Sequence, residues 1–157
     1  MDITDNLTEI EIELFAKSLS ESAIDGHFDD MFSNKSFSLK YLNEVSNRGL
    51  VPGYGSAKGL LFAFKENNEC VCFALVCTSI IPQADTELLF FVVPKIHRNK
   101  GNAKKAMYLL LSELKGNSLI ARCMPKSTFM VDLLVKTGFS KINLGKSKNI
   151  NLIYKNG

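Results

Sequence analysis

The chain has 157 residues, of which 46% are hydrophobic and 22% charged, the size and composition of one ordinary globular domain. It has no run of about 18 apolar residues that could span a membrane, and its start, Met1-Asp2-Ile3-Thr4-Asp5, lacks the apolar core of a secretory signal, so we expect a cytoplasmic protein without a membrane partner. The four cysteines show no Cys-x-x-Cys spacing and only two histidines accompany them, so we expect buried thiols and no metal site.

The net charge of +3 is unevenly distributed along the chain. Residues 1–56 carry four basic and ten acidic side chains, a net charge of −6, whereas residues 57–157 carry fifteen basic and six acidic ones, a net charge of +9. The basic part could bind nucleic acid, but aromatic residues are not interleaved with its lysines and arginines. Nucleic acid is therefore not the expected partner, and strongly salt-dependent binding to DNA or RNA would contradict this.

The first 56 residues are predicted to be mainly helical. Thr8-Glu9-Ile10-Glu11 has the spacing of a capping box, which predicts a helix from about Glu9. A second helix is predicted over 38–48, with Gly49 as its stop, and a glycine-rich loop follows over 49–56. The connection over 25–37 is polar and has no clear pattern apart from a candidate short helical turn around 29–32.

Three strands are predicted next, in an antiparallel meander with short turns, at 60–64, 70–81 and 86–93. Cys70 and Cys72 are two residues apart on the second strand and are expected to share one face of the sheet. Glu87 is expected to share a face of the third strand, provided no bulge intervenes, with Leu89, Phe91 and Val93.

Helices and strands alternate in the rest of the chain. Apolar residues recur at helical spacing from Ala103, which predicts a helix over 102–115 and, because it forms a crossover, a parallel strand over 118–123. A last helix is predicted to open at Pro125 and Ser127, with an apolar stripe formed by Phe129, Met130, Leu133 and Leu134. A hairpin over 142–154 ends the chain. The fold class is α/β (α+β), with a mixed central sheet of about six to seven strands flanked by about four helices.

A basic turn joins the third strand to the helix that follows, Arg98-Asn99-Lys100-Gly101-Asn102-Ala103. Helix N-termini carry partial positive charge and usually take acidic residues, yet Lys100, Lys104 and Lys105 gather at this one. Three cations beside a positive dipole indicate a bound anion, most simply a phosphate or pyrophosphate.

The spacing Arg98-x-x-Gly101-x-Ala103 resembles the acyl-CoA-binding signature Arg/Gln-x-x-Gly-x-Gly/Ala of the GNAT N-acetyltransferase superfamily. The order of elements from about Leu60 onward is also similar to that family. The resemblance implies a GNAT-type fold, acetyl-CoA as co-substrate, no metal, and direct acetyl transfer to an amine on a small molecule, peptide or protein. The alternative is a GNAT-fold protein that binds CoA or a partner without catalysis, as a regulatory or interaction module.

On this reading the chain is a single domain over 1–157, with a helical acceptor side at 1–56 and an acyl-CoA-binding core at 60–157. In the family, turn amides hold the pyrophosphate and a strand edge holds the pantetheine arm. The residues that match those positions, or could add a cofactor contact, are Val92, Val93, Arg98, Asn99, Lys100, Gly101, Asn102, Ala103 and Ser127. The segment from Pro94 to Arg98 is one residue longer than the commonest family spacing.

Glu87 is the implied general base. It stands eleven residues before Arg98, as a glutamate does in some family members, and it is the sole acidic residue inside the central strand. The alternative is a solvated glutamate at a strand end.

The resemblance does not identify the general acid, because Leu134 stands where the family often has tyrosine. Either another group gives the proton, or the thiolate leaves without one, or the protein is not an acetyltransferase. The candidate substitutes are Cys123, Tyr108, Tyr154 and Ser127. His97 is expected to face solvent or a phosphate, and His27 is expected to be a solvated loop residue.

The acceptor would lie on the acidic side of the molecule. Asp29, Asp30, Glu44 and the loop at Tyr54 could attract a cationic amine. An apolar pocket is the alternative, lined by Phe28, Phe32, Phe37 and Tyr41. An exposed C-terminal strand would permit a homodimer.

Overall fold

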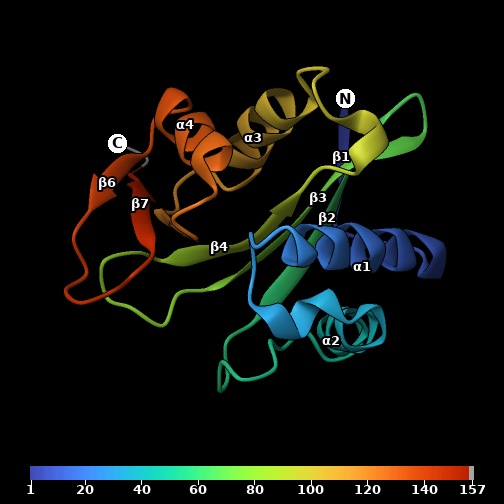
Figure 1. The fold of residues 1–157 in the computed structure, drawn as a ribbon, viewed down its shortest axis with the longest axis horizontal. Coiled ribbons are helices and arrows are strands. Elements are labelled where there is room, and N and C mark those ends of the chain that lie inside the picture. Colours follow the sequence, from blue (N-terminus) through green and yellow to red (C-terminus); the bar gives the residue numbers. More distant parts are fainter. Residues whose placement is uncertain (156–157) are drawn as a thin grey trace.

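The computed structural model describes residues 1–155 and contains one seven-stranded mixed sheet between two layers of helices (Figure 1). The strands follow the order β1-β2-β3-β4-β5-β7-β6 across the sheet. They are β1 (Asp2–Thr4), β2 (Gly59–Glu66), β3 (Glu69–Thr78), β4 (Thr86–Val92), β5 (Leu119–Cys123), β6 (Ser140–Ile142) and β7 (Ile150–Tyr154). The helices are α1 (Glu9–Ile24), α2 (Lys35–Arg48), α3 (Asn102–Glu113) and α4 (Thr128–Lys136), with 3-10 helices η1 (Asp30–Ser33) and η2 (Lys95–His97).

The predicted fold class is confirmed, since one parallel pair, β4 with β5, joins an otherwise antiparallel sheet. Helices α1 and α2 lie on one face of the sheet and α3 and α4 on the other (Figure 1). Each face has its own apolar core. Phe15 of α1 stacks on Phe73 of β3 with ring centroids 5.0 Å apart, while Met107 and Leu110 of α3 are fully buried on the opposite face. Within residues 1–155 no helix is long and apolar enough to cross a bilayer.

The capping box predicted for the first helix is present. The Thr8 hydroxyl accepts a hydrogen bond from the Glu11 amide at 3.2 Å, and the Glu11 carboxylate accepts one from the Thr8 amide at 2.8 Å. Both amides belong to the first turn, where no helical carbonyl can accept their hydrogen bonds. Helix α1 consequently begins at Glu9, as predicted.

Glu11 also fixes α1 to the sheet. Its carboxylate forms an ion pair with Lys65 of β2 and accepts a hydrogen bond from the thiol of Cys70 at 3.4 Å. Burial alone would raise the pKa of Glu11, but the hydrogen bonds from Lys65, the Thr8 amide and Cys70 outweigh it and lower the pKa from 4.5 to about 2. The folded state therefore favours the ionised carboxylate.

We expect Glu11→Gln to lower the free energy of unfolding by about 1–2 kcal/mol at neutral pH. Because the folded-state pKa is lowered, this stabilisation is fully present above pH 4.5 and is lost as the pH falls toward about 2. Urea unfolding of both proteins across this range measures the difference. The control is Glu9→Gln, which removes an exposed acidic residue from the same first turn of α1. A difference that stays constant down to the lowest pH would contradict the role given to Glu11.

Two parts of the secondary-structure prediction were wrong. The strand β1 was not predicted, because three residues carry too short a pattern; it forms by pairing Ile3 with Phe64 at the edge of β2. In the last helix Phe129 is 71% exposed, while Val131 is buried in its place. Leu133 and Leu134 are buried, as predicted.

A bulge in β3 separates the two neighbouring cysteines. Phe64 pairs with Cys72 and Lys65 pairs with Cys70, which leaves Val71 as an extra residue. The prediction that the cysteines share a face is therefore wrong: Cys70 lies on the α1 side and Cys72 in the core under α3. All four cysteines are free and buried.

A second bulge, in β4, changes the face of the sheet on which its residues lie. Leu75 pairs with Phe90 and Val76 with Leu88, so Leu89 is the extra residue. Beyond it the alternation is reversed. Glu87 therefore shares its face with Phe90 and Val92 on the α1–α2 side, whereas Phe91 and Val93 of the predicted set lie on the α3–α4 side. The bulged residue Leu89 packs against the α1–α2 core.

The predicted C-terminal hairpin is present as β6 and β7. Strand β7 lies between β5 and β6, so the exposed edge is β6, which is only three residues long. The last strand, β7, is paired on both sides, so an exposed C-terminal strand of the kind that would permit a homodimer is not formed by β7.

Candidate active site

Strands β4 and β5 pair at only three positions and then separate. The paired residues are Thr86 with Leu119, Glu87 with Ile120, and Leu88 with Ala121. Beyond them β4 continues against β3, while β5 continues against β7. The edge of β4 after Leu88 therefore has no strand partner, which leaves backbone groups free to bind an extended ligand.

A turn with free amides follows this unpaired edge. Asn99 and Gly101 have left-handed φ values of 61° and 78°, and Gly101 is the N-cap of α3. Among the described residues, the backbone amides of 99–104 donate to no backbone carbonyl; the first that does is the Lys105 amide, to the Gly101 carbonyl at 3.3 Å. Successive free amides at the start of a twelve-residue helix form an anion-binding N-terminus.

Lysines lie around these amides, as predicted. Lys100 and Lys104 are exposed and form no ion pair within residues 1–155, while Lys105 lies 3.7 Å from the Glu66 carboxylate. Two cations thus remain available to an anion at the turn.

Arg98 and Asn102 hold the turn in shape. Arg98 Nε donates to the Val93 carbonyl at 2.9 Å, and its Nη2 lies 3.4 Å from the Ser22 hydroxyl of α1. Asn102 Nδ2 donates to the His97 carbonyl at 2.9 Å. Both side chains, and the Val93 carbonyl, are thus engaged within the protein, so contacts to a ligand would come from backbone amides of this segment.

His97 does not face solvent or the turn, contrary to prediction. It is 8% exposed, and its Nε2 lies 3.3 Å from the Glu69 carboxylate at the start of β3. The longer connection after Pro94 forms the 3-10 helix η2, and this extra turn directs His97 inward.

His27 is not a solvated loop residue either. Its Nδ1 lies 2.7 Å from the hydroxyl of Ser127, a buried residue at the N-cap of α4. The segment after α1 is thereby joined to the start of α4. The Ser127 hydroxyl could contact a cofactor only by sharing or exchanging this hydrogen bond.

Glu87 is buried, at 2% exposure, so its reading as a solvated strand-end residue was wrong. Its Oε1 accepts a hydrogen bond from Arg122 Nη2 of β5 at 2.7 Å. The guanidinium supplies the counter-charge that a buried carboxylate requires. Arg122 was not recognised from the sequence, although a single arginine in an otherwise apolar strand, Leu119-Ile120-Ala121-Arg122-Cys123, was the available signal.

Three protonated groups surround this pair. Burial, with a smaller effect of the charge of Glu87, raises the pKa of Tyr54 to about 12 and the pKa of Cys77 to about 12. Burial, with a smaller effect of Glu87, also raises the pKa of Tyr41. Near neutral pH all three keep their protons, so Cys77 is no nucleophile, and the two phenols can donate hydrogen bonds.

The predicted substitutes for the missing tyrosine differ in position. Cys123 is buried at the end of β5, and burial raises the pKa of its thiol to about 11. Tyr108 is exposed on α3, and Tyr154 packs against Phe139. Leu134 itself is fully buried in the core.

Aromatic rings form a wall beside Glu87. Phe28, Phe32 and Tyr41 contact Phe90 of β4, with ring centroids 5.3, 4.9 and 5.9 Å from it. Of the predicted acidic residues, Asp29 contributes to the raised pKa of Tyr54, while Glu44 is half-buried and pairs with Arg48. The apolar alternative for this region fits these contacts better than the acidic one.

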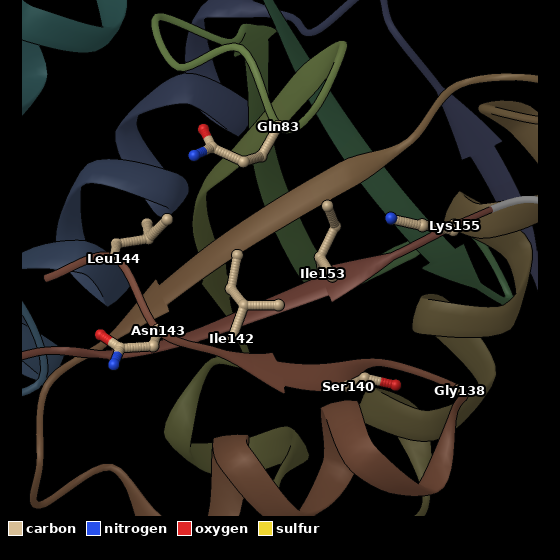
Figure 2. A pocket seen from close by; sticks show the side chains of 8 residues that line it. All are labelled: Gln83, Gly138, Ser140, Ile142, Asn143, Leu144, Ile153 and Lys155. Atoms are coloured by element: carbon tan, nitrogen blue, oxygen red, sulfur yellow. The ribbon is translucent and has the colours of Figure 1, made fainter.

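Two surface pockets lie away from the turn. The one in Figure 2 has a volume of about 490 Å³ and is lined by Gln83, Gly138, Ser140, Ile142, Asn143, Leu144, Ile153 and Lys155. The other, of about 500 Å³, lies between α4 and β6. Neither includes a predicted site residue. Among the described residues, no group of histidine, cysteine and acidic side chains could hold a metal ion.

No protein-family model matches the sequence, and no curated protein matches it significantly. Solved structures match over nearly the whole chain. An N-acetyltransferase from Staphylococcus aureus Mu50 is 14% identical over 100% of both chains, with a TM-score of 0.71. The PaiA N-acetyltransferase from Thermoplasma acidophilum, in complex with coenzyme A, is 14% identical over 99% of both chains, with a TM-score of 0.65. A GNAT family acetyltransferase from Elizabethkingia anophelis with acetyl-CoA bound is 18% identical over 62% of this chain and 76% of its own, with a TM-score of 0.51.

The chain has the GNAT fold. The fold expected from the spacing Arg98-x-x-Gly101-x-Ala103 and from the order of elements is thereby confirmed. At identities of 14–18% the likeness establishes the GNAT fold alone, so the reaction has to be argued from the chemistry of the site.

Proposed function

We propose that this GNAT-fold protein transfers an acetyl group from acetyl-CoA to an amine by direct attack. The observation that carries the proposal is the run of free backbone amides over 99–104, at the end of the unpaired edge of β4. These amides, with Lys100 and Lys104, would bind the pyrophosphate. The edge at Val92 and the Val93 amide would bind the pantetheine arm, which directs the thioester toward Glu87.

The reaction does not require a covalent intermediate with the protein. The amine nitrogen attacks the thioester carbonyl carbon, the carbon–sulfur bond breaks, and CoA leaves as a thiolate. Positioning the amine against the thioester supplies much of the acceleration. Glu87 accepts the proton from the amine at Oε2, since Arg122 is bonded to Oε1. The phenol of Tyr54 is a candidate proton donor to the thiolate, because its pKa responds to the charges of both Glu87 and Arg122.

Three accompanying features are part of the proposal. The cofactor is acetyl-CoA, without a metal. The compartment is the cytoplasm, which the four buried free thiols support. The residues over 1–56 form the acceptor side, which the aromatic wall on Phe90 supports.

Two measurements on the purified protein test this function. Calorimetry with CoA should show binding at one site per chain. A thiol-release assay with acetyl-CoA and a panel of amines should show turnover with at least one acceptor. Absence of CoA binding would contradict the proposal outright.

A second function is a GNAT-fold protein that binds CoA without catalysis. The buried Leu134, at the position where the family often has tyrosine, favours it. CoA binding with no turnover on any amine of a broad panel would select this second function.

A further inference from the structure

The Glu87–Arg122 pair is unequally exposed. The Glu87 side chain is 3% exposed and the Arg122 side chain 27%. An acceptor that approaches this face of the sheet therefore meets a guanidinium before it meets the carboxylate.

The pair belongs to a polar row across four strands. Cys77 of β3 is the register partner of Glu87 in β4, and Asn151 of β7 is the register partner of Arg122 in β5. Asn151 is 4% exposed, and its Oδ1 has no hydrogen-bond partner within the described part of the chain. Arg122 Nε is likewise buried and unpartnered there. Buried polar atoms nearly always have partners, so the row has one spare acceptor and one spare donor.

The row lies where β4 and β5 separate. Arg122 follows Ala121, the last β5 residue that pairs with β4. On β4 the bulged residue Leu89 is two positions from Glu87. A thioester held along the free edge of β4 would thus have its carbonyl beside the row.

Charge balance limits which acceptors this row can take. A simple amine that draws Glu87 toward itself would leave the largely buried guanidinium without a partner, which is costly. An acceptor with an amino group and a carboxylate can exchange partners with the pair: its carboxylate binds Arg122 and its amino group binds Glu87. Every charge then stays compensated, and arginine suits the planar carboxylate geometrically.

We propose that the acceptor is an α-amino acid or a close equivalent, whose carboxylate is bound by Arg122 while Glu87 takes the proton of its amino group. The inference rests on the proposed function and names its substrate class. The acceptor binds as its ammonium form and first gives one proton to Glu87. Its nitrogen then forms the carbon–nitrogen bond, the thioester carbon–sulfur bond breaks, and the second proton of the nitrogen passes to the CoA thiolate, so the products are the amide and the CoA thiol.

The pocket in Figure 2 offers room for the acceptor's side chain. Ile142, one of its lining residues, is the register partner of Asn151, so the pocket begins beside the polar row. Figure 2 shows Ile142 and Ile153 pointing into the same space, toward Gln83. The lining is aliphatic here, and the volume of about 490 Å³ exceeds what one amino-acid side chain needs.

Acceptor pairs that differ only in the carboxylate test the inference. Suitable pairs are leucine with 3-methylbutylamine, phenylalanine with phenethylamine, and lysine with cadaverine. We expect the carboxylate-bearing member of at least one pair to have a kcat/KM roughly 100-fold higher than its decarboxylated partner. Calorimetry with each compound on the CoA-saturated protein gives a readout that needs no turnover, and the same preference is expected there.

A variant of Arg122 separates recognition from folding. Arg122→Lys keeps the positive charge beside Glu87 but loses the bidentate contact with a carboxylate. We therefore expect the kcat/KM preference for the carboxylate-bearing acceptor to fall below about tenfold, while CoA affinity is unchanged. Arg48→Lys, at an arginine side chain 70% exposed on α2, should leave the preference intact.

Each failure has its own meaning. Equal use of both members of every pair overturns the inference and leaves the proposed function standing. CoA binding with no binding of any amino acid also overturns it. Loss of CoA binding in the unaltered protein overturns the proposed function itself.

Discussion

Gly101→Glu is expected to weaken CoA binding at least about 100-fold, a loss of about 3 kcal/mol. A Cβ at Gly101 would meet no atom within 4 Å, so the new side chain has room. Its carboxylate, however, would lie among the free amides of 99–104 and repel the pyrophosphate. Calorimetry with CoA measures the effect.

The matched control is Gly116→Glu, at the other end of α3. Gly116 also has a left-handed φ, 92° against 78° at Gly101, and a Cβ there also meets nothing within 4 Å. Both variants therefore share the backbone strain and the added charge, and both should lose similar stability. Only Gly101→Glu should lose CoA. If it binds CoA as well as the parent does, the coenzyme has been assigned to the wrong turn.

Glu87→Gln is expected to lower kcat by about 10²- to 10⁴-fold, which is the usual contribution of a general base to the rate. The amide is nearly isosteric and should leave CoA affinity within about twofold, because Glu87 contacts neither the turn nor its lysines in this fold. Since Arg122 loses its counter-charge, stability should also fall, by about 1–3 kcal/mol. Steady-state kinetics, CoA calorimetry and urea unfolding separate the three effects.

Asp85→Asn is the control for that experiment. Asp85 lies two residues away at the exposed start of β4, where its carboxylate accepts hydrogen bonds from the Ser118 amide and hydroxyl, each at 3.0 Å. Its replacement should leave kcat unchanged. Activity of Glu87→Gln close to that of the parent would remove Glu87 as the base and would favour the CoA-binding function without catalysis.

Local sequence signals predicted much of this architecture. The capping box at Thr8 and Glu11 marked the start of α1, and the turn around Gly101 was placed correctly on a helix N-terminus. In both cases the residues that decide the structure are neighbours in the chain. Their hydrogen-bonding and φ requirements can therefore be read without knowledge of the fold.

The errors share a different origin. The bulges at Val71 and Leu89 arise from pairing with the neighbouring strand, so alternation within one strand could not reveal them. Each reversed which side chains share a face, and the second moved Glu87 to the α1–α2 side. Arg122 meets Glu87 only because β5 lies parallel to β4, a contact across 35 residues. The candidate base could be named from sequence, but its partner could not.

The early separation of β4 from β5 leaves the two half-sheets, β1–β4 and β5–β7, with three aligned residue pairs in the strand ladder between them, beside the Asp85–Ser118 and Glu87–Arg122 side-chain bonds. We expect this short ladder to be the least stable junction of the sheet when no ligand is bound along it. A coenzyme bound along this junction would contact both halves at once and couple their opening. Occupancy by the coenzyme would then govern the rigidity of the whole sheet, including the distant edge at β6.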